Sequence, residues 1–168
     1  SNTHYAQGGI AAVMADDDTI SSHIYDTMSA GAGLCWKPAV DVLCSQGSDA
    51  INELVRLGVD FDRTTHGFAR GLEAAHSHAR ILHVGGDATG AGISNALVTA
   101  VKERVREIRD HTFLVDIIVE DNRVVAVDLL DVGGITRVET DAVLLASGGA
   151  GQLYRHTTNP AVTTGDGV

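Results

Sequence analysis

The sequence has 168 residues, 44% hydrophobic and 20% charged, which is the composition of a folded globular domain and not of a disordered chain. Its net charge of −10, with no basic stripe, argues against nucleic acid as a partner. No apolar run reaches the ~18–20 residues of a membrane span, and no signal peptide is recognised. The two cysteines, Cys35 and Cys44, lack a CxxC spacing, which favours free core thiols in a reducing compartment over a disulfide or a metal site.

The first third of the chain predicts helices. An acidic run, residues 16–18, precedes a helix over roughly residues 19–31. The run can bind a cation or serve as the start of the helix, and the helix start is the simpler interpretation. Pro38 suits the first turn of a second helix. Gly47 is expected to break or kink that helix, and Ser48 to cap a third one that Gly58 closes.

The middle of the chain alternates short extended pieces with a helix. Residues 59–62 look extended, and the polar residues 63–80 predict a loop or a short two-stranded turn. Residues 80–84 look like a strand. A helix follows over about residues 91–109, because its apolar residues recur at three- to four-residue spacing: Ile93, Leu97, Val101, Val105 and Ile108.

The last third changes to a strand pattern. Residues 112–120, 123–130 and 135–140 are separated by turn residues and predict a β-meander. Residues 142–146 form an apolar run typical of a buried parallel strand. The expected fold class is therefore α/β, mixed α+β locally, with helices, a meander and a buried parallel strand in one domain.

The opening of the chain is the first candidate site. Small polar residues lead to an aromatic, Tyr5, and then to the pair Gly8-Gly9. Glycines permit a positive φ and a close approach of backbone to a ligand. The segment is therefore either an ordinary turn or one wall of a site that holds a flat cofactor against main-chain N–H groups.

A second glycine-rich turn, residues 146–151, follows the expected parallel strand. The carboxyl end of such a strand is where open α/β sheets bind ligands, although many such turns are only tight connections. Further on, Asp166 lies between two glycines in a run of threonines and glycines. An aspartate in that setting is either a turn former or a ligand contact.

The third candidate site is a polar cluster over residues 73–83. His76 and His78 lie on the same side of an extended strand and could ligate zinc, but a third ligand is not obvious. The histidines could also lie in a solvated loop. In the remaining interpretation the cluster binds a small anionic or zwitterionic substrate, and Glu73 pairs with an ammonium group.

Several motifs together resemble the fumarate reductase/succinate dehydrogenase/L-aspartate oxidase flavoprotein family, and its L-aspartate oxidase branch most closely. The most specific is H-S-x-x-R-I-L-H followed by D-A-T-G, at residues 76–83 and 87–90. Others are A-G-A-G-L-C at 30–35, G-V-x-F-D at 58–62, A-S-G-G at 146–149, and T-T-N-P followed by T-G-D-G at 157–167. The resemblance covers nearly the whole chain.

The resemblance implies FAD as the cofactor. Relatives that attach FAD covalently carry a histidine one residue after the serine, where this chain has Asn2, so it implies non-covalent FAD. It implies flavin contacts from the opening segment, from the start of the meander, from the glycine-rich turn and from one aspartate near the end. These residues are Asn2, Thr3, His4, Tyr5, Ala6, Gln7, Gly8, Gly9, Phe113, Leu114, Ala146, Ser147, Gly148, Gly149 and Asp166.

The resemblance also implies an activity. Glu73 matches the family glutamate that senses the amino group separating aspartate from succinate, and Glu73 and His76 are the candidate catalytic residues. The implied enzyme is cytoplasmic and oxidises L-aspartate to iminoaspartate, with oxygen or fumarate as acceptor. Its product feeds quinolinate and NAD synthesis, with channelling to quinolinate synthase. The family usually has Glu-Gly-Gly-His where this chain has Ala74 and Ala75.

The chain resembles an excerpt of a longer protein. The G-x-G-x-x-G pyrophosphate fingerprint is absent from residues 1–168, and so are the family's capping domain and catalytic arginine. We therefore expect one partial FAD-binding domain that binds FAD weakly or not at all and is inactive by itself. A fumarate reductase or succinate dehydrogenase flavoprotein subunit, or a non-catalytic domain that retains the scaffold, are the alternatives.

Overall fold

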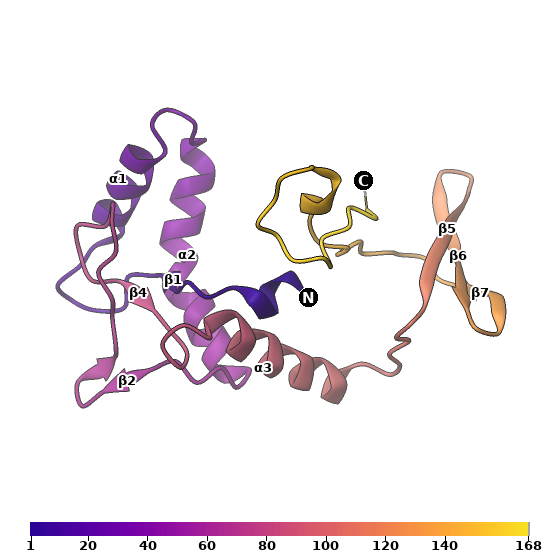
Figure 1. Cartoon of the computed structure of the whole chain (residues 1–168), viewed down its shortest axis with the longest axis horizontal. Coiled ribbons are helices and arrows are strands. Elements are labelled where there is room, and N and C mark those ends of the chain that lie inside the picture. The colour runs from indigo at the N-terminus through magenta and orange to yellow at the C-terminus, as the bar shows by residue number, and fades with distance from the viewer. Residues whose placement is uncertain (168) are drawn as a thin grey trace. The chain divides into compact units, whose positions relative to one another are not determined.

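A computed structural model describes residues 1–167 of the chain (Figure 1). The backbone forms two compact units, Ser1–Glu103 and Arg104–Val168, and each is described here by itself. The first unit carries the predicted helices and the second carries the predicted meander. The expectation of a single partial domain stays a prediction.

Helix α1, Ile20–Ala30, forms where the sequence predicts it. Its N-cap is Thr19, whose side-chain oxygen accepts a hydrogen bond from the backbone N–H of Ser22 at 3.1 Å. The buried residues of this helix are the polar His23 and Asp26. The helix therefore presents hydrogen-bonding groups to the interior, which the apolar spacing did not predict.

Helix α2, Lys37–Arg56, is one continuous helix of 20 residues, so the expected break and the separate third helix are wrong. A Cβ added at Gly47 would meet the Cβ of Ala12 at 3.6 Å, in ordinary contact. Ser48, expected as an N-cap, donates its hydroxyl to the carbonyl of Val13 at 2.5 Å. Packing against the chain segment after β1 keeps the helix intact where local propensity predicts a break.

The core of the first unit forms around a short antiparallel pair. Strand β1, Ile10–Ala11, pairs with β4, Ile81–Leu82, which confirms a strand within residues 80–84 in a shorter form. The pair is covered by residues of α2, of α3 and of the extended segment before β2. The buried hydrophobic cluster consists of Ala12, Ile51, Val59, Phe61, Leu82 and Ile93.

A short hairpin and a third helix complete the first unit. Strands β2, Arg63–Thr64, and β3, Gly67–Phe68, form a two-stranded turn, which is one of the two alternatives predicted for residues 63–80. Helix α3, Thr89–Arg104, begins slightly earlier than predicted and ends short of residue 109. Val105 and Ile108 lie beyond its end and are exposed, so the predicted apolar face does not extend to them.

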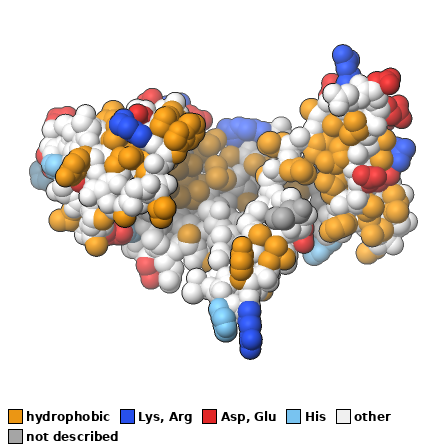
Figure 2. All heavy atoms as spheres, turned by 90° about the horizontal axis from the view of Figure 1, so that it is seen from above, with side chains coloured by type: hydrophobic (Ala, Val, Ile, Leu, Met, Phe, Trp, Pro, Cys, Tyr) orange, Lys and Arg blue, Asp and Glu red, His pale blue; other side chains and the backbone are white. Residues whose placement is uncertain are grey.

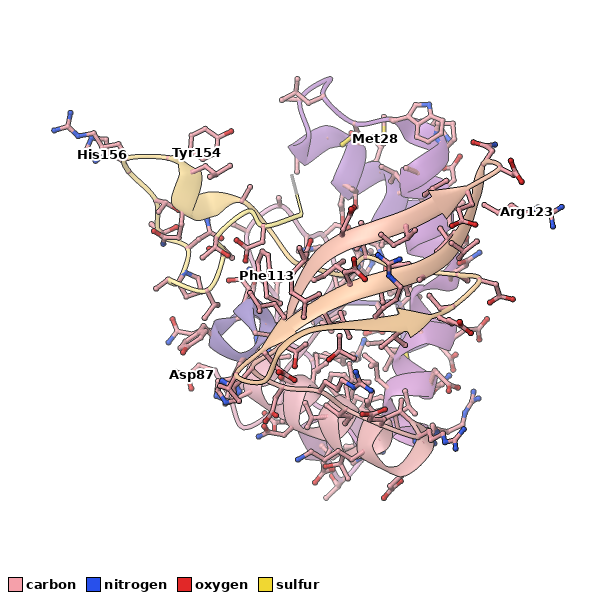
Figure 3. The ribbon with its side chains drawn as sticks, turned by 90° about the vertical axis from the view of Figure 1, so that its right-hand side faces the viewer. Met28, Asp87, Phe113, Arg123, Tyr154 and His156 are labelled. Atoms are coloured by element: carbon pink, nitrogen blue, oxygen red, sulfur yellow. The ribbon has the colours of Figure 1, made fainter. Side chains whose placement is uncertain are left out.

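The second unit contains the predicted meander, with strands β5, Phe113–Glu120, β6, Arg123–Asp131, and β7, Gly134–Glu139, in that order. Asp121 and Asn122 both have positive φ, +47° and +61°, as a tight hairpin turn between twisted strands requires. Figure 3 shows Phe113 where β5 begins and Arg123 at the far end of the hairpin. Hydrophobic side chains gather on the sheet, with charged ones along its rim (Figure 2).

The predicted buried parallel strand over residues 142–146 is wrong. The segment has no strand partner, and Leu144 is 92% exposed. All strand pairs among the described residues are antiparallel. A short 3₁₀ helix, η2, Gly151–Leu153, follows it. The observed fold is therefore mixed, with helices and small antiparallel sheets. No helix in residues 1–167 is both long and apolar enough to cross a bilayer.

Candidate functional site

The β1–β4 pair brings the opening segment beside the polar cluster of residues 73–83. The 3₁₀ helix η1, Asn2–Tyr5, and the residues up to Gly8 are exposed, and β1 begins directly after Gly9. A Cβ added at Gly9 would lie 2.6 Å from the carbonyl oxygen of Leu82 and 2.9 Å from Nε2 of His83. Only glycine allows this approach, so the Gly-Gly turn rests directly on the strand that leads into His83.

Glu73 lies beside the same ring nitrogen of His83 that Gly9 approaches. Its Oε1 lies 3.6 Å from His83 Nε2, and its side chain is 55% exposed. A hollow of about 380 Å³ adjoins His83 and is lined by Asp62, Ala69, Arg70, Gly71, His83 and Gly86. The opening turn, His83, Glu73 and a polar hollow thus form one neighbourhood within the first unit.

His76, the second candidate catalytic residue, faces a different group. Its Nδ1 lies 3.2 Å from Nη1 of Arg80, and its ring centroid lies 5.8 Å from that of His23. It contacts Glu73 through the backbone, because its N–H donates to the Glu73 carbonyl at 3.2 Å. The structure therefore pairs the Glu73 carboxylate with His83 and turns the imidazole of His76 towards Arg80.

Arg80 is the centre of a buried polar network that the sequence did not reveal. Its side chain is fully buried, and its Nε and Nη2 donate to the two carboxylate oxygens of Asp18 at 2.7 and 2.8 Å. Nη1 donates to Oδ2 of Asp26 at 2.7 Å, and Nη2 donates to the Ser22 hydroxyl at 3.2 Å. The network ties α1 and the residues before it to the segment that carries Glu73.

The loop after Glu73 is anchored on α1 by Asp26. The backbone N–H and the hydroxyl of Ser77 both donate to Asp26 Oδ2 at 2.8 Å. These bonds, the backbone one first, with that from Arg80, lower the pKa of Asp26 from 3.8 to about 2 despite its burial. The paired guanidinium of Arg80 likewise lowers the pKa of Asp18.

The missed residues had a recognisable signal. Asp18, Ser22 and Asp26 are spaced four apart, so they lie on one face of α1 and of the turn before it. His23 is buried beside them with its Nδ1 unpaired among the described residues, and burial lowers its pKa. A polar stripe at helical spacing, combined with a later arginine, could have predicted a buried charge network.

Ala75 adopts a conformation that suits glycine. Its φ is +69°, in the left-handed region, at a position where the family resemblance implies glycine. An alanine there costs about 1–2 kcal/mol of local strain. The anchoring of Ser77 on Asp26, two residues further on, holds the loop in this conformation.

The D-A-T-G motif supports the opening segment. The Gly90 N–H donates to the carbonyl of Ala6 at 2.9 Å, and a Cβ at Gly90 would lie 2.7 Å from that oxygen. Thr89 is buried, and its hydroxyl accepts the N–H of Val84 at 3.2 Å. The first turn of α3 therefore fixes the segment that ends in Gly8 and Gly9.

The candidate residues of the second unit lie in two places. Phe113 and Leu114 begin β5 opposite Leu130 and Leu129 of β6. Ala146–Gly149 are exposed, and a Cβ at Gly167 would lie 3.0 Å from Cβ of Ser147, so the T-G-D-G turn is packed on this segment. Asp166 accepts a hydrogen bond from the Thr164 hydroxyl at 2.6 Å. The structure thus brings Asp166 close to Ser147.

The metal interpretation receives no support from the geometry. Within residues 1–167 no group of His, Cys, Asp and Glu side chains converges to hold a metal ion. His78 Nδ1 instead lies 3.0 Å from the Ser77 hydroxyl and 3.5 Å from Asp18 Oδ1. Both cysteines are free thiols, and Cys44 is buried as predicted.

The exposed glycine turns fit a flavin cofactor. A Cβ added at Gly8 or at Gly148 would meet no atom within 4 Å, so a flat ring can approach the backbone at both places. The carboxylate of Asp62 accepts the N–H groups of Gly85 and Gly86 at 2.8 and 2.9 Å, so those donors are already satisfied. Both open turns, at Gly8 and at Gly148, belong to segments that the family resemblance assigns to FAD.

These features define a flavin-binding class of domain, and comparison with known families agrees. The chain belongs to the FAD binding domain family, whose sequence model matches residues 1–168. Within it, the chain is similar to L-aspartate oxidases. It is 44% identical to the L-aspartate oxidase of Streptomyces coelicolor, over 99% of this chain and 30% of that relative. It is 45% identical to the L-aspartate oxidase of Caulobacter vibrioides, over 98% of this chain and 33% of that relative.

A solved structure of the same kind of flavoprotein has the same fold. The E. coli quinol fumarate reductase chain FrdA superposes with a TM-score of 0.87 at 30% identity, over 99% of this chain and 29% of that chain. The resemblance read from the motifs is confirmed. The chain spans about a third of the length of the L-aspartate oxidases it matches.

Proposed function

We propose that the full-length protein is an FAD-dependent oxidase that converts L-aspartate to iminoaspartate, with oxygen or fumarate as the final electron acceptor. The observation that carries the proposal is the β1–β4 pair, which sets the Gly8-Gly9 turn against His83 and, through His83, close to Glu73. The similarity to L-aspartate oxidases supports the choice of substrate.

The residues have separate roles in this proposal. FAD is held non-covalently by residues 2–9, Phe113 and Leu114, Ala146–Gly149 and Asp166, and it supplies the hydride acceptor when bound. L-Aspartate loses a hydride from Cα and a proton from its ammonium group to become iminoaspartate. The Glu73 carboxylate pairs with that ammonium group and orients Cα. His76 supports Glu73 through the hydrogen bond between their backbones.

The cellular setting follows from the same proposal. The product is an unstable imine, so the consuming reaction must be close at hand, and we propose quinolinate synthase as the partner in NAD synthesis. The two free thiols suit a reducing compartment, which supports the cytoplasm.

The test compares substrates and one residue in the full-length protein. L-Aspartate should reduce the bound flavin and succinate should not. Glu73→Gln should raise the KM for L-aspartate by about tenfold, since a hydrogen bond between charged groups contributes about 1.5–3 kcal/mol. Glu53→Gln is the matched control, because Glu53 is also 55% exposed and lies on α2 in an ion pair with Arg56. Equal behaviour of the two variants would contradict the role of Glu73.

A second candidate function is that of a fumarate reductase or succinate dehydrogenase flavoprotein, because the fold matches FrdA closely. Asn2, where covalent relatives carry histidine, and the motif of residues 76–83 favour aspartate. Flavin reduction by succinate but not by L-aspartate in the full-length protein would establish this alternative.

A further inference from the structure

His83 lies in a slot formed by two glycines. A Cβ at Gly9 would lie 2.9 Å from its Nε2, and a Cβ at Gly71 would lie 3.2 Å from its Cε1. Neither glycine has a positive φ, so backbone conformation does not require glycine at either position. The imidazole, which is 25% exposed, occupies part of the space at both glycines, together with Ile81 and Leu82.

The backbone of His83 is fixed as well. Its carbonyl accepts the N–H of Asp62 at 2.8 Å, and it follows directly on β4, whose residues are buried. The ring is therefore attached to the best-packed part of the first unit. Glu73, by contrast, lies on an exposed segment before the strained Ala75.

The Glu73 carboxylate has one side-chain partner among residues 1–167, and that partner is His83. The distance of 3.6 Å from Oε1 to Nε2 is within ion-pair range and longer than a hydrogen bond. Oε2 has no partner in the described structure. With the imidazole beside one carboxylate oxygen, the other oxygen is left to accept a hydrogen bond from a ligand ammonium group.

We propose that His83 is a positioning residue that directs the Glu73 carboxylate towards the opening turn and thereby favours an aminated dicarboxylate over its unaminated analogue. The inference rests on the proposed function, since it requires Glu73 to contact the substrate ammonium group. The preference for the aminated dicarboxylate then depends on Gly9 and Gly71, because these two glycines leave the space in which the His83 ring lies.

The test compares two variants of the full-length protein in which an amide side chain of different length replaces the imidazole of His83. His83→Gln can still place an N–H donor near Glu73, whereas the amide of His83→Asn is one methylene too short. The KM for L-aspartate should rise about tenfold in His83→Asn and at most about twofold in His83→Gln. The kcat and the competitive inhibition constant of succinate should change by less than about threefold in both. His66→Asn, an exposed histidine in the β2–β3 turn, is the control.

A parallel change of aspartate KM and succinate inhibition in His83→Asn, or no change in either, would overturn the inference. Glu73→Gln separates this failure from that of the proposed function. If Glu73→Gln leaves the aspartate KM unaltered, the substrate site itself is wrong. If Glu73→Gln raises it and the two His83 variants behave alike, only the positioning role is wrong. In the double variant Glu73→Gln/His83→Asn, we expect no further loss beyond that of Glu73→Gln.

Discussion

Two arginines of this chain bind an aspartate with the same geometry, one in the interior and one at the surface. Arg80 holds Asp18 through Nε and Nη2 at 2.7 and 2.8 Å, and Arg137 holds Asp128 through the same atoms at 2.7 and 2.7 Å. The first pair is 0% and 1% exposed, and the second is 57% and 17% exposed. Two ion pairs of the same geometry can therefore contribute differently to the free energy of unfolding.

The difference lies in solvent and in the length of chain that each pair connects. Asp128 of β6 and Arg137 of β7 are cross-strand neighbours that the sheet already aligns, and water screens their charges. Arg80 joins Asp18 and Asp26, residues far away in the sequence, and the two carboxylate side chains are only 1% and 8% exposed. Removing one member of the buried set leaves uncompensated charges in the interior.

The largest effect is expected from Arg80→Met. It removes the cation and leaves two buried carboxylates, so the free energy of unfolding of the chain should fall by about 3–5 kcal/mol. Urea denaturation followed by circular dichroism measures the change. A loss below about 1 kcal/mol would mean that the buried and exposed pairs are equivalent.

The next expected effect is acid sensitivity. The pKa of Asp26 is lowered to about 2 in the folded chain from 3.8, so its stabilisation is fully present above its ordinary pKa. That contribution is lost as the pH falls from about 4 towards 2, because the carboxylate must then be protonated in both states. Asp26→Asn should be less stable at neutral pH and lose less stability over this interval. Parallel pH curves of urea midpoints for the two proteins would contradict the assignment.

A smaller effect of opposite sign is expected at Ala75. Ala75→Gly should raise the free energy of unfolding by about 1 kcal/mol, since glycine relieves a left-handed φ of +69°. Ala74→Gly is the control. Ala74 does not have a positive φ, so glycine there only adds freedom to the unfolded chain and should lower stability by about 0.4–1 kcal/mol. Thermal midpoints that move together would show that strain at Ala75 is absent.

The smallest effect is expected from Arg137→Met, at about 0–1 kcal/mol, decreasing further in high salt. The same urea experiment at low and high ionic strength measures it. A salt-independent loss of stability as large as that of Arg80→Met would contradict this expectation. It would mean that the meander depends on the Arg137–Asp128 pair although Arg137 is exposed.

Elements with strong local signals were predictable from the sequence. The meander follows from β-branched apolar runs and turn residues, and the helix α1 follows from an acidic run before residues at helical spacing, all of which act over a few neighbours. The hairpin β2–β3 is one of the two alternatives that the polar residues 63–80 predicted. The motifs at the opening, at residues 76–90 and near the end indicated a flavoprotein, and the family match confirmed it. These properties are determined locally, so the sequence alone carries them.

Other features depend on what each segment packs against. Gly47 stays inside a helix because Ala12 and Val13 lie beside it, and residues 142–146 form no strand because the described chain offers no partner. Likewise, only tertiary structure decides that Arg80 is buried between aspartates and that His83, not His76, meets the Glu73 carboxylate. The sequence determined the family and the chemistry available. The pairing of β1 with β4 decided which side chains meet, because contacts between distant segments have no local signal.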